Sequence, residues 1–356
     1  SPAEIRRTLF DSLINCRSIR ECVLDYHIDD YNFNGEQDRG IPVDGATTQI
    51  QALNEIESLE SIVILWGLND FLQSESAFND LLLRDNASSK KRKKLEVLAL
   101  ENCELSPRSL EIMFSDESGI KKIFLKHVLT SEDQIESIIG YLRTNRTLQF
   151  LEITWEDVDE ILFTVPRAIR LFNALEGNTT LKSLEIDILC PPPYNLTPTF
   201  EHCLRRLSSL QVLGLNLISE EESGGFLEYL SSVIKGFDGN KSIKVLDIDL
   251  HGPLGGQVES STEIINKSLL HALKGTSVLE TFSLWVPHHA HSDNVRINLT
   301  DETKFLLSLN ETWMQELSER PDDIKLWSDT VMERKSDTRI VNHLIRQNHA
   351  LLLPQE

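Results

Sequence analysis

One short pattern of apolar positions recurs along the chain: an apolar residue, two free positions, an apolar residue, one free position and a third apolar residue. Eight copies are present: Leu59/Ile62/Ile64, Leu95/Leu98/Leu100, Ile120/Ile123/Leu125, Leu148/Leu151/Ile153, Leu181/Leu184/Ile186, Leu210/Leu213/Leu215, Ile243/Leu246/Ile248 and Leu279/Phe282/Leu284. A ninth, Ile19/Cys22/Leu24, has a cysteine in the second place, and successive copies begin 25 to 40 residues apart. The alternation within each copy predicts a short strand buried on one face.

Between these copies the apolar spacing changes to three and four residues, which predicts helices with one apolar face. The clearest sets are Ile135/Ile138/Ile139/Leu142, Ile169/Leu171/Phe172/Leu175, Phe226/Leu227/Leu230/Val233 and Ile264/Ile265/Leu269/Leu270/Leu273. A single strand and helix cannot bury their own apolar faces, so the units must stack. We therefore predict an α/β solenoid with a parallel sheet of at least eight strands over residues 59–286. Its second-position residues should be buried in register: Leu98, Ile123, Leu151, Leu184, Leu213 and Leu246.

The segment Leu95-Glu-Val-Leu98-Ala-Leu100-Glu-Asn-Cys103-Glu-Leu105 resembles the leucine-rich repeat, with Cys103 at its Asn/Cys position. Long repeats with a full helix resemble the ribonuclease-inhibitor-like subfamily, over roughly residues 19–286. This resemblance implies a horseshoe with a concave parallel sheet and convex helices. The other copies lack Asn or Cys at that position, so we expect irregular turns after their strands. They carry Gly67, Val128, Glu156, Leu189, Ile218, His251 and Pro287.

Three regions depart from the repeat. Residues 31–48 and 190–198 are rich in glycine or proline and are expected to be loops. Beyond about residue 300 the strand pattern stops, and Asp301 is placed to cap a helix. We therefore expect a solenoid of eight or nine repeats over residues 1–300 and a helical C-terminal cap over residues 301–356.

Composition and charge limit the function. The chain has 356 residues, of which 40% are hydrophobic, and a formal net charge of −21. That apolar content supports an ordered core. The negative charge repels nucleic acid and anionic membranes, so we expect neither as a partner, and no apolar run is long enough to span a bilayer. A protein partner with a basic surface fits better.

The cysteines and other short motifs bear on the compartment. The five cysteines are scattered without paired spacing, which indicates buried free thiols, Cys103 among them, and a cytoplasmic location. A basic run at residues 90–94 leaves nuclear import open, and eight Asn-x-Ser/Thr sequons leave secretion open. Asn145, Asn178 and Asn240 each precede a strand pattern by three residues, where the repeat needs a polar turn. Part of the sequon excess therefore has a structural origin.

The free positions of the strands point away from the helices and form the candidate binding surface. Its candidate residues are Glu152, Glu185, Asp187, Asn216, Asp247, Asp249, Trp285, Lys122, Phe124 and Lys126. Carboxylates on strands about 4.8 Å apart would form one negative field that steers a basic partner. An ordinary solvated charged face is the alternative. Either way we expect exposed Asp187 and Asp249, whose neutralisation leaves stability unchanged.

No nucleotide-binding, hydrolase or metalloprotease motif is present, so we expect a non-enzymatic protein-interaction scaffold without a cofactor. The cluster His288, His289, His291 and Asp293 is too closely spaced to surround one ion, and no metal site is expected. Two alternatives stay open. The resembled subfamily includes GTPase-activating and ribonuclease-inhibiting proteins, which implies a regulator of another enzyme. A hydrolase could instead use Glu185/Asp187 or Asp247/Asp249.

Overall fold

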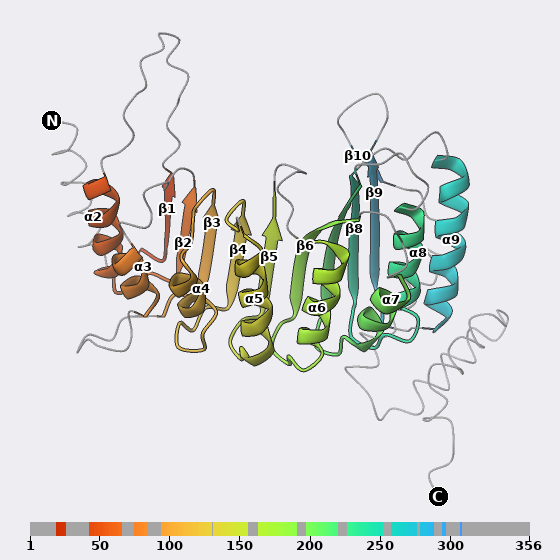
Figure 1. Cartoon of the computed structure of the whole chain (residues 1–356), viewed down its shortest axis with the longest axis horizontal. Helices are drawn as coiled ribbons and strands as arrows, with labels where there is room; N and C mark the ends of the chain where they lie inside the picture. Colours follow the sequence, from red (N-terminus) through yellow and green to blue (C-terminus); the bar gives the residue numbers. More distant parts are fainter. Residues whose placement is uncertain are drawn as a thin grey trace, which may run out of the picture. The chain divides into compact units, whose positions relative to one another are not determined.

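The computed structural model describes residues 19–25, 43–65, 75–83, 94–129, 131–155, 163–190, 197–219, 226–251, 258–275, 278–287, 294–296 and 307. The chain divides into two compact units, Ser1–Leu189 and Cys190–Glu356, and strands alternate with helices in both (Figure 1). The expected helical cap, apart from Leu307, and the expected boundary near residue 300 lie outside the described residues.

In its described residues the first unit has six strands that follow one another in a parallel sheet. Its elements are β1 (Glu21–Asp25), α2 (Val43–Asn54), β2 (Ser61–Leu65), α3 (Glu75–Leu82), β3 (Val97–Glu101), α4 (Pro107–Met113), β4 (Lys122–Lys126), α5 (Glu132–Thr144), β5 (Phe150–Thr154), α6 (Val165–Leu175) and β6 (Ser183–Leu189). The ninth copy of the pattern is therefore also a strand, since β1 pairs with β2.

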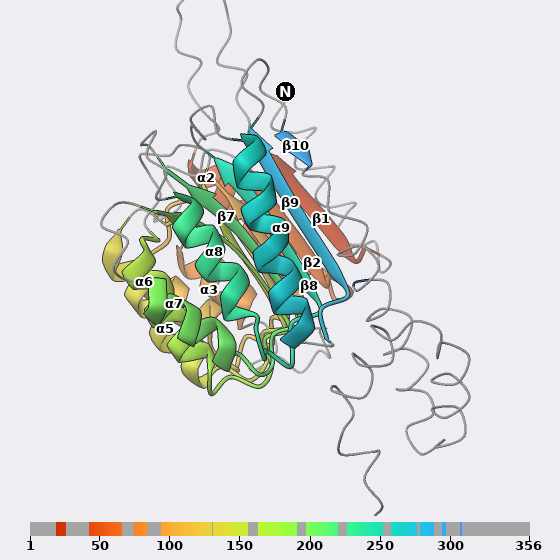
Figure 2. The same cartoon turned by 90° about the vertical axis from the view of Figure 1, so that its right-hand side faces the viewer.

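The second unit continues the alternation. Its elements are α7 (Thr197–Arg206), β7 (Val212–Ile218), α8 (Phe226–Gly236), β8 (Val245–His251), α9 (Val258–Gly275), β9 (Thr281–Pro287) and β10 (Asn294–Arg296). Strands β7, β8 and β9 are parallel, whereas β10 pairs antiparallel with the end of β9. In the view of Figure 2, α8 and α9 lie on one side of β8 and β9.

The second-position residues are paired in register, as predicted. Leu98, Ile123, Leu151 and Leu184 are successive partners in the first unit, and Leu213 pairs with Leu246 in the second. All are buried. The predicted α/β solenoid of strand–helix units is thereby confirmed, while the horseshoe curvature stays a prediction.

Both loop predictions were too long. Helix α2 already begins at Val43 and α7 at Thr197, so residues 43–48 and 197–198 are helical. The second case has a simple cause. Pro198 is the second residue of α7, and proline is tolerated in a first helical turn because the amide hydrogen that it lacks has no partner there.

Three buried asparagines connect successive repeats. Asn178 donates from Nδ2 to the carbonyl oxygens of Leu142, at 2.7 Å, and Asn145, at 3.2 Å, in the preceding repeat. Its Oδ1 accepts from the backbone N–H groups of Thr180 and Leu181 at 2.9 and 2.8 Å, where the next strand approaches. One side chain thus satisfies four backbone groups that would otherwise be buried without partners.

The same arrangement recurs in both units. Nδ2 of Asn145 donates to the Phe114 carbonyl at 2.6 Å, and Nδ2 of Asn240 donates to the Leu204 and Leu207 carbonyls at 2.9 and 3.1 Å. The hydroxyl of Ser242, the third residue of the Asn240 sequon, also donates to the Leu207 carbonyl at 2.8 Å. The structural origin predicted for these sequons is confirmed, because a side chain that is 0–4% exposed and fully hydrogen-bonded leaves no room for a glycan.

We predict that Asn178→Asp destabilises the protein by roughly 1–3 kcal/mol or more, because it removes both donors and faces two buried carbonyl oxygens with a carboxylate. Chemical denaturation of the full chain measures the effect. Asn173→Asp is the matched control, since Asn173 is exposed on α6 nearby. Equal stabilities of the two variants would contradict the bridging role of Asn178.

Candidate functional site

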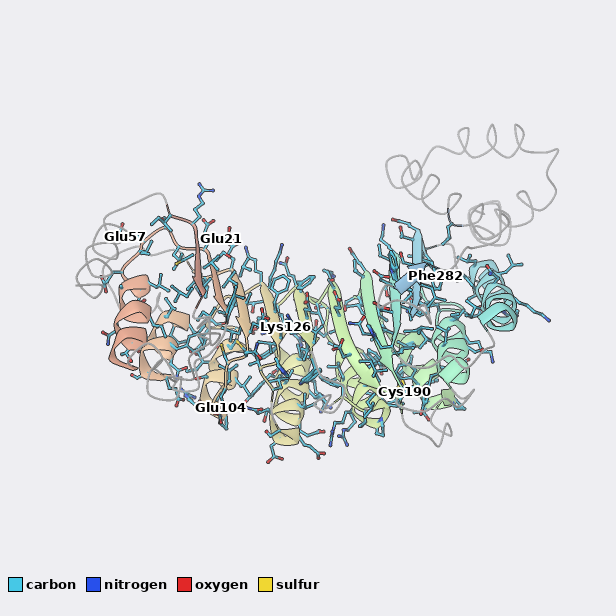
Figure 3. The ribbon with its side chains drawn as sticks, turned by 90° about the horizontal axis from the view of Figure 1, so that it is seen from above. Glu21, Glu57, Glu104, Lys126, Cys190 and Phe282 are labelled. Carbon is cyan, nitrogen blue, oxygen red and sulfur yellow. The ribbon has the colours of Figure 1, made fainter. Side chains whose placement is uncertain are left out.

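The sheet of each unit has an open face, the face turned away from the helices. Figure 3 shows helices on one side of the strands and strand side chains on the other. The first, third and fifth residues of β1 to β9 are directed towards the open face, because successive side chains alternate. The second and fourth residues are buried, as in β2 and β5. All candidate residues named from the sequence occupy open-face positions.

Strand β4 brings basic and aromatic side chains to this face. Lys122 is exposed, whereas Phe124 and Lys126 are half-buried. The ring of Phe124 lies against that of Phe150 on β5, with centroids 4.6 Å apart. Nζ of Lys126, labelled in Figure 3, lies 2.8 Å from Oε1 of Glu101 on β3. The strand therefore adds an apolar surface as well as positive charge.

Two carboxylates stand opposite each other on the next two strands. Glu152 of β5 and Glu185 of β6 are directly paired in the register, and both are half-buried. Partial burial raises the pKa of Glu152, and the nearby charge of Asp187 raises it further, while Lys126 acts in the opposite direction. The net effect disfavours the ionised form, so this position favours an additional positive charge nearby.

Asp187 corrects an expectation. Its side chain is only 3% exposed, and its Oδ2 accepts a hydrogen bond of 2.7 Å from the backbone N–H of Trp155. After β3 and β4 the corresponding N–H groups, of Asn102 and His127, donate instead to backbone carbonyls of the next strand. Asp187 thus supplies an acceptor at an irregular turn, and its neutralisation cannot be assumed to leave stability unchanged.

The open face of the second unit carries a separate polar set. Asn216, Asp249 and Trp285 are aligned across β7, β8 and β9. Asp247 is exposed, and Trp285 is 36% exposed, which is unusual for so large an apolar side chain. Nε2 of His251 lies 3.5 Å from Oδ2 of Asp249. A single acidic field that joins this set to Glu152 and Glu185 stays a prediction, since the two sets belong to different units.

One feature of the first unit was missed from the sequence. Val23, Val63, Ala99 and Phe124 are aligned on adjacent strands, followed by Glu152 and Glu185. We call these six residues the central row. Val23 is 54% exposed. A signal was present, since the free positions of the first strand copies are themselves apolar and the register predicted from the repeat places them side by side.

The other candidate groups offer little chemistry. Burial raises the pKa of the Cys103 and Cys190 thiols to about 12, so neither is a nucleophile at neutral pH. Neither forms a disulfide, and nor does Cys22, which is partly exposed rather than buried as expected. Across the described ranges no His, Cys, Asp and Glu cluster could hold a metal ion. The cluster at residues 288–293 lies outside these ranges, as do residues 90–93 of the basic run.

The alternating strands and helices make the chain a repeat α/β solenoid. None of the helices in the described part is long and apolar enough to cross a membrane. No family model matches the chain, and no curated protein matches its sequence. Among solved structures it is similar to leiomodin-1 actin-binding site 2, with 12% identity and a TM-score of 0.28 over 54% of this chain and 81% of that one. So distant a likeness supports no inference about function.

We predict that Asp187→Ala destabilises the protein by about 1–3 kcal/mol, because the buried N–H of Trp155 loses its acceptor. Thermal and chemical unfolding measure the change. Glu185→Ala, two residues earlier on the same strand, should cost less, because this carboxylate is half-buried whereas Asp187 is buried. If Asp187→Ala is as stable as Glu185→Ala, the hydrogen bond to Trp155 is not structurally important.

The raised pKa of Glu152 predicts a pH-dependent effect. Its folded-state pKa lies above its unfolded value, so ionisation costs stability as pH rises through the unfolded pKa. Glu152→Gln should therefore raise the melting temperature at pH 7, and the gain should vanish near pH 3, where the carboxyl is protonated in both states. Calorimetry at several pH values measures this. A less stable variant at pH 7 would mean that the attraction to Lys126 outweighs burial and Asp187.

Proposed function

We propose that this chain is a non-enzymatic protein-interaction module of the leucine-rich-repeat kind, similar to the ribonuclease-inhibitor-like subfamily, and that its partner binds on the open face. The repeat pattern around Leu98 and the strand–helix alternation support the family assignment. The central row supports the binding role. It places apolar and charged side chains together on a sheet face that no described helix covers.

A mixed face of this kind suits protein recognition. Apolar side chains such as Val23 and Phe124 lose water when a partner docks, while Glu152 and Glu185 select its charge. We propose a partner with a basic surface, because the chain is strongly acidic and its open-face carboxylates attract cations over a distance. Asp247, Asp249, Asn216 and Trp285 are the corresponding contact residues that we propose for the second unit.

The regulatory alternative is a special case of this proposal, in which the bound partner is itself an enzyme. The hydrolase alternative receives less support. One of its two carboxylate pairs, Glu185/Asp187, includes a side chain that is buried and hydrogen-bonded to the backbone of Trp155. A general acid or base must instead reach the substrate. We also propose a cytoplasmic location. It is supported by Cys103, Cys190 and Cys203, which form no disulfide, and by the buried sequon asparagines.

Affinity capture with blocking variants tests the open face. Ala99→Arg places a long cation on the open face of the first unit, and Asp247→Arg does so on that of the second. We predict that one of them reduces capture of the specific partners at least about tenfold, because a charged side chain at the centre of an interface costs more than about 1.4 kcal/mol. Quantitative mass spectrometry of the captured proteins measures the change.

Gly140→Arg is the control variant. Gly140 is exposed on α5, and a side chain added there meets no atom within 4 Å. All three variants should melt at the wild-type temperature. Partners that are captured equally by wild type, both blocking variants and their double variant would place binding elsewhere and refute the proposal.

A further inference from the structure

We propose that the central row is a docking site for an amphipathic helix of the partner protein. The apolar stripe of that helix lies across β1 to β4, and a basic residue beyond the stripe meets Glu152 and Glu185. This inference rests on the proposed function and specifies the partner's secondary structure, apolar spacing and charge at the site.

The central row runs across the strands rather than along them. Val23, Val63, Ala99 and Phe124 are direct partners in the register of four neighbouring strands. The stripe is therefore about 14 Å long, three strand spacings of about 4.8 Å. Its neighbours on the same face include charged groups: Lys122 is exposed on one flank, and the Glu101–Lys126 ion pair lies on the other. Apolar side chains also lie on these flanks, since Val97, Phe150 and Leu65 are half-buried at the first or fifth position of their strands. The surface is therefore apolar along its middle and charged beside β4, which suits a partner with one apolar face and polar sides.

Spacing distinguishes a helix from an extended peptide. Helical residues i, i+4, i+7 and i+11 lie on one face and span about 16.5 Å, close to the length of the stripe. Four alternate residues of an extended peptide span about 20 Å, because each pair of residues advances by about 6.6 Å. Over four contacts the extended peptide is therefore longer than the stripe by more than one strand spacing. The length of the helical segment differs from that of the stripe by only about half a strand spacing.

The acidic end of the row determines where the partner's charge lies. Glu152 and Glu185 lie about 19 and 24 Å from the start of the row, four and five strand spacings away. Residues i+14 and i+15 of the docked helix reach about 21 to 22 Å, between the two carboxylates. A lysine or arginine there would contact both. It would also relieve the repulsion between carboxylates that face each other across adjacent strands.

The small side chain of Ala99 leaves a shallow depression in the stripe. It is the smallest side chain of the row and lies between Val63 and Phe124, whose ring is supported by Phe150. A large residue of the partner, such as leucine or phenylalanine, fits over Ala99 with the Phe124 ring as a wall. A buried anchor of this kind contributes most of the affinity in helix-in-groove complexes.

Selection from a peptide library tests the inference and requires no identified partner. Random 20-residue peptides displayed on phage are selected on the full-length chain, with Ala99→Arg protein as the counter-selection. We expect the enriched peptides to be apolar at helical spacing, with Lys or Arg at i+14 or i+15. Synthetic copies should bind at least about tenfold more weakly to Ala99→Arg, and severalfold more weakly to Glu152→Gln/Glu185→Gln, than to wild type or Gly140→Arg.

Other results overturn the inference. Peptides with apolar residues at every second position would mean an extended ligand. The basic helix would be excluded if the enriched peptides had an acidic end. It would also be excluded if the selection enriched no peptide whose binding depends on Ala99. A dimer of the full chain in sedimentation that Ala99→Arg dissolves would assign the row to a second copy. In each case, loss of natural partners in the capture experiment with Ala99→Arg or Asp247→Arg would leave the proposed function standing.

Discussion

Each strand and helix of this chain buries only one face, so every repeat depends on its neighbours for its core. The second-position residues show this, since Leu151 and Leu184 are partners on adjacent strands of different repeats and both are completely buried. The hydrophobic effect brings the repeats together but does not fix the distance between their backbones. That distance is fixed by hydrogen bonds. The amides of Asn145, Asn178 and Asn240 bridge from one repeat to the preceding one and satisfy backbone groups in both.

This dependence explains which surfaces remain for function. Helices cover one face of the sheet and must stay apolar towards it, so only the open face and the solvent side of the helices can vary without loss of the core. In the first unit that freedom is used for an apolar row ended by Glu152 and Glu185, with Lys122 and Lys126 beside it. In the second unit the same positions carry Asp247, Asp249 and an exposed Trp285. The two units therefore carry different side chains at the same strand positions of their repeats.

The turn after β5 shows that the fold itself can require a particular residue at an open-face position. The N–H of Trp155 donates to the carboxylate of Asp187, whereas the N–H groups of Asn102 and His127 after β3 and β4 donate to backbone carbonyls. Asp187 is then unavailable to a partner, and its charge acts on Glu152 instead. One irregular turn thus removes an acidic contact residue from the open face and changes the ionisation of another.

The sequence alone determined where the strands lie, which of their residues are buried and which occupy the open face. Alternation of apolar residues depends only on the local period of a strand. It also indicated the structural role of Asn178. It could not predict the burial of Asp187, since that depends on an acceptor for the N–H of a residue 32 positions away. Nor did it show that Val23, Val63, Ala99 and Phe124 form one stripe. The repeat pattern predicts that these positions align, but only the tertiary structure decides that Val23 stays exposed and that Phe124 lies against Phe150.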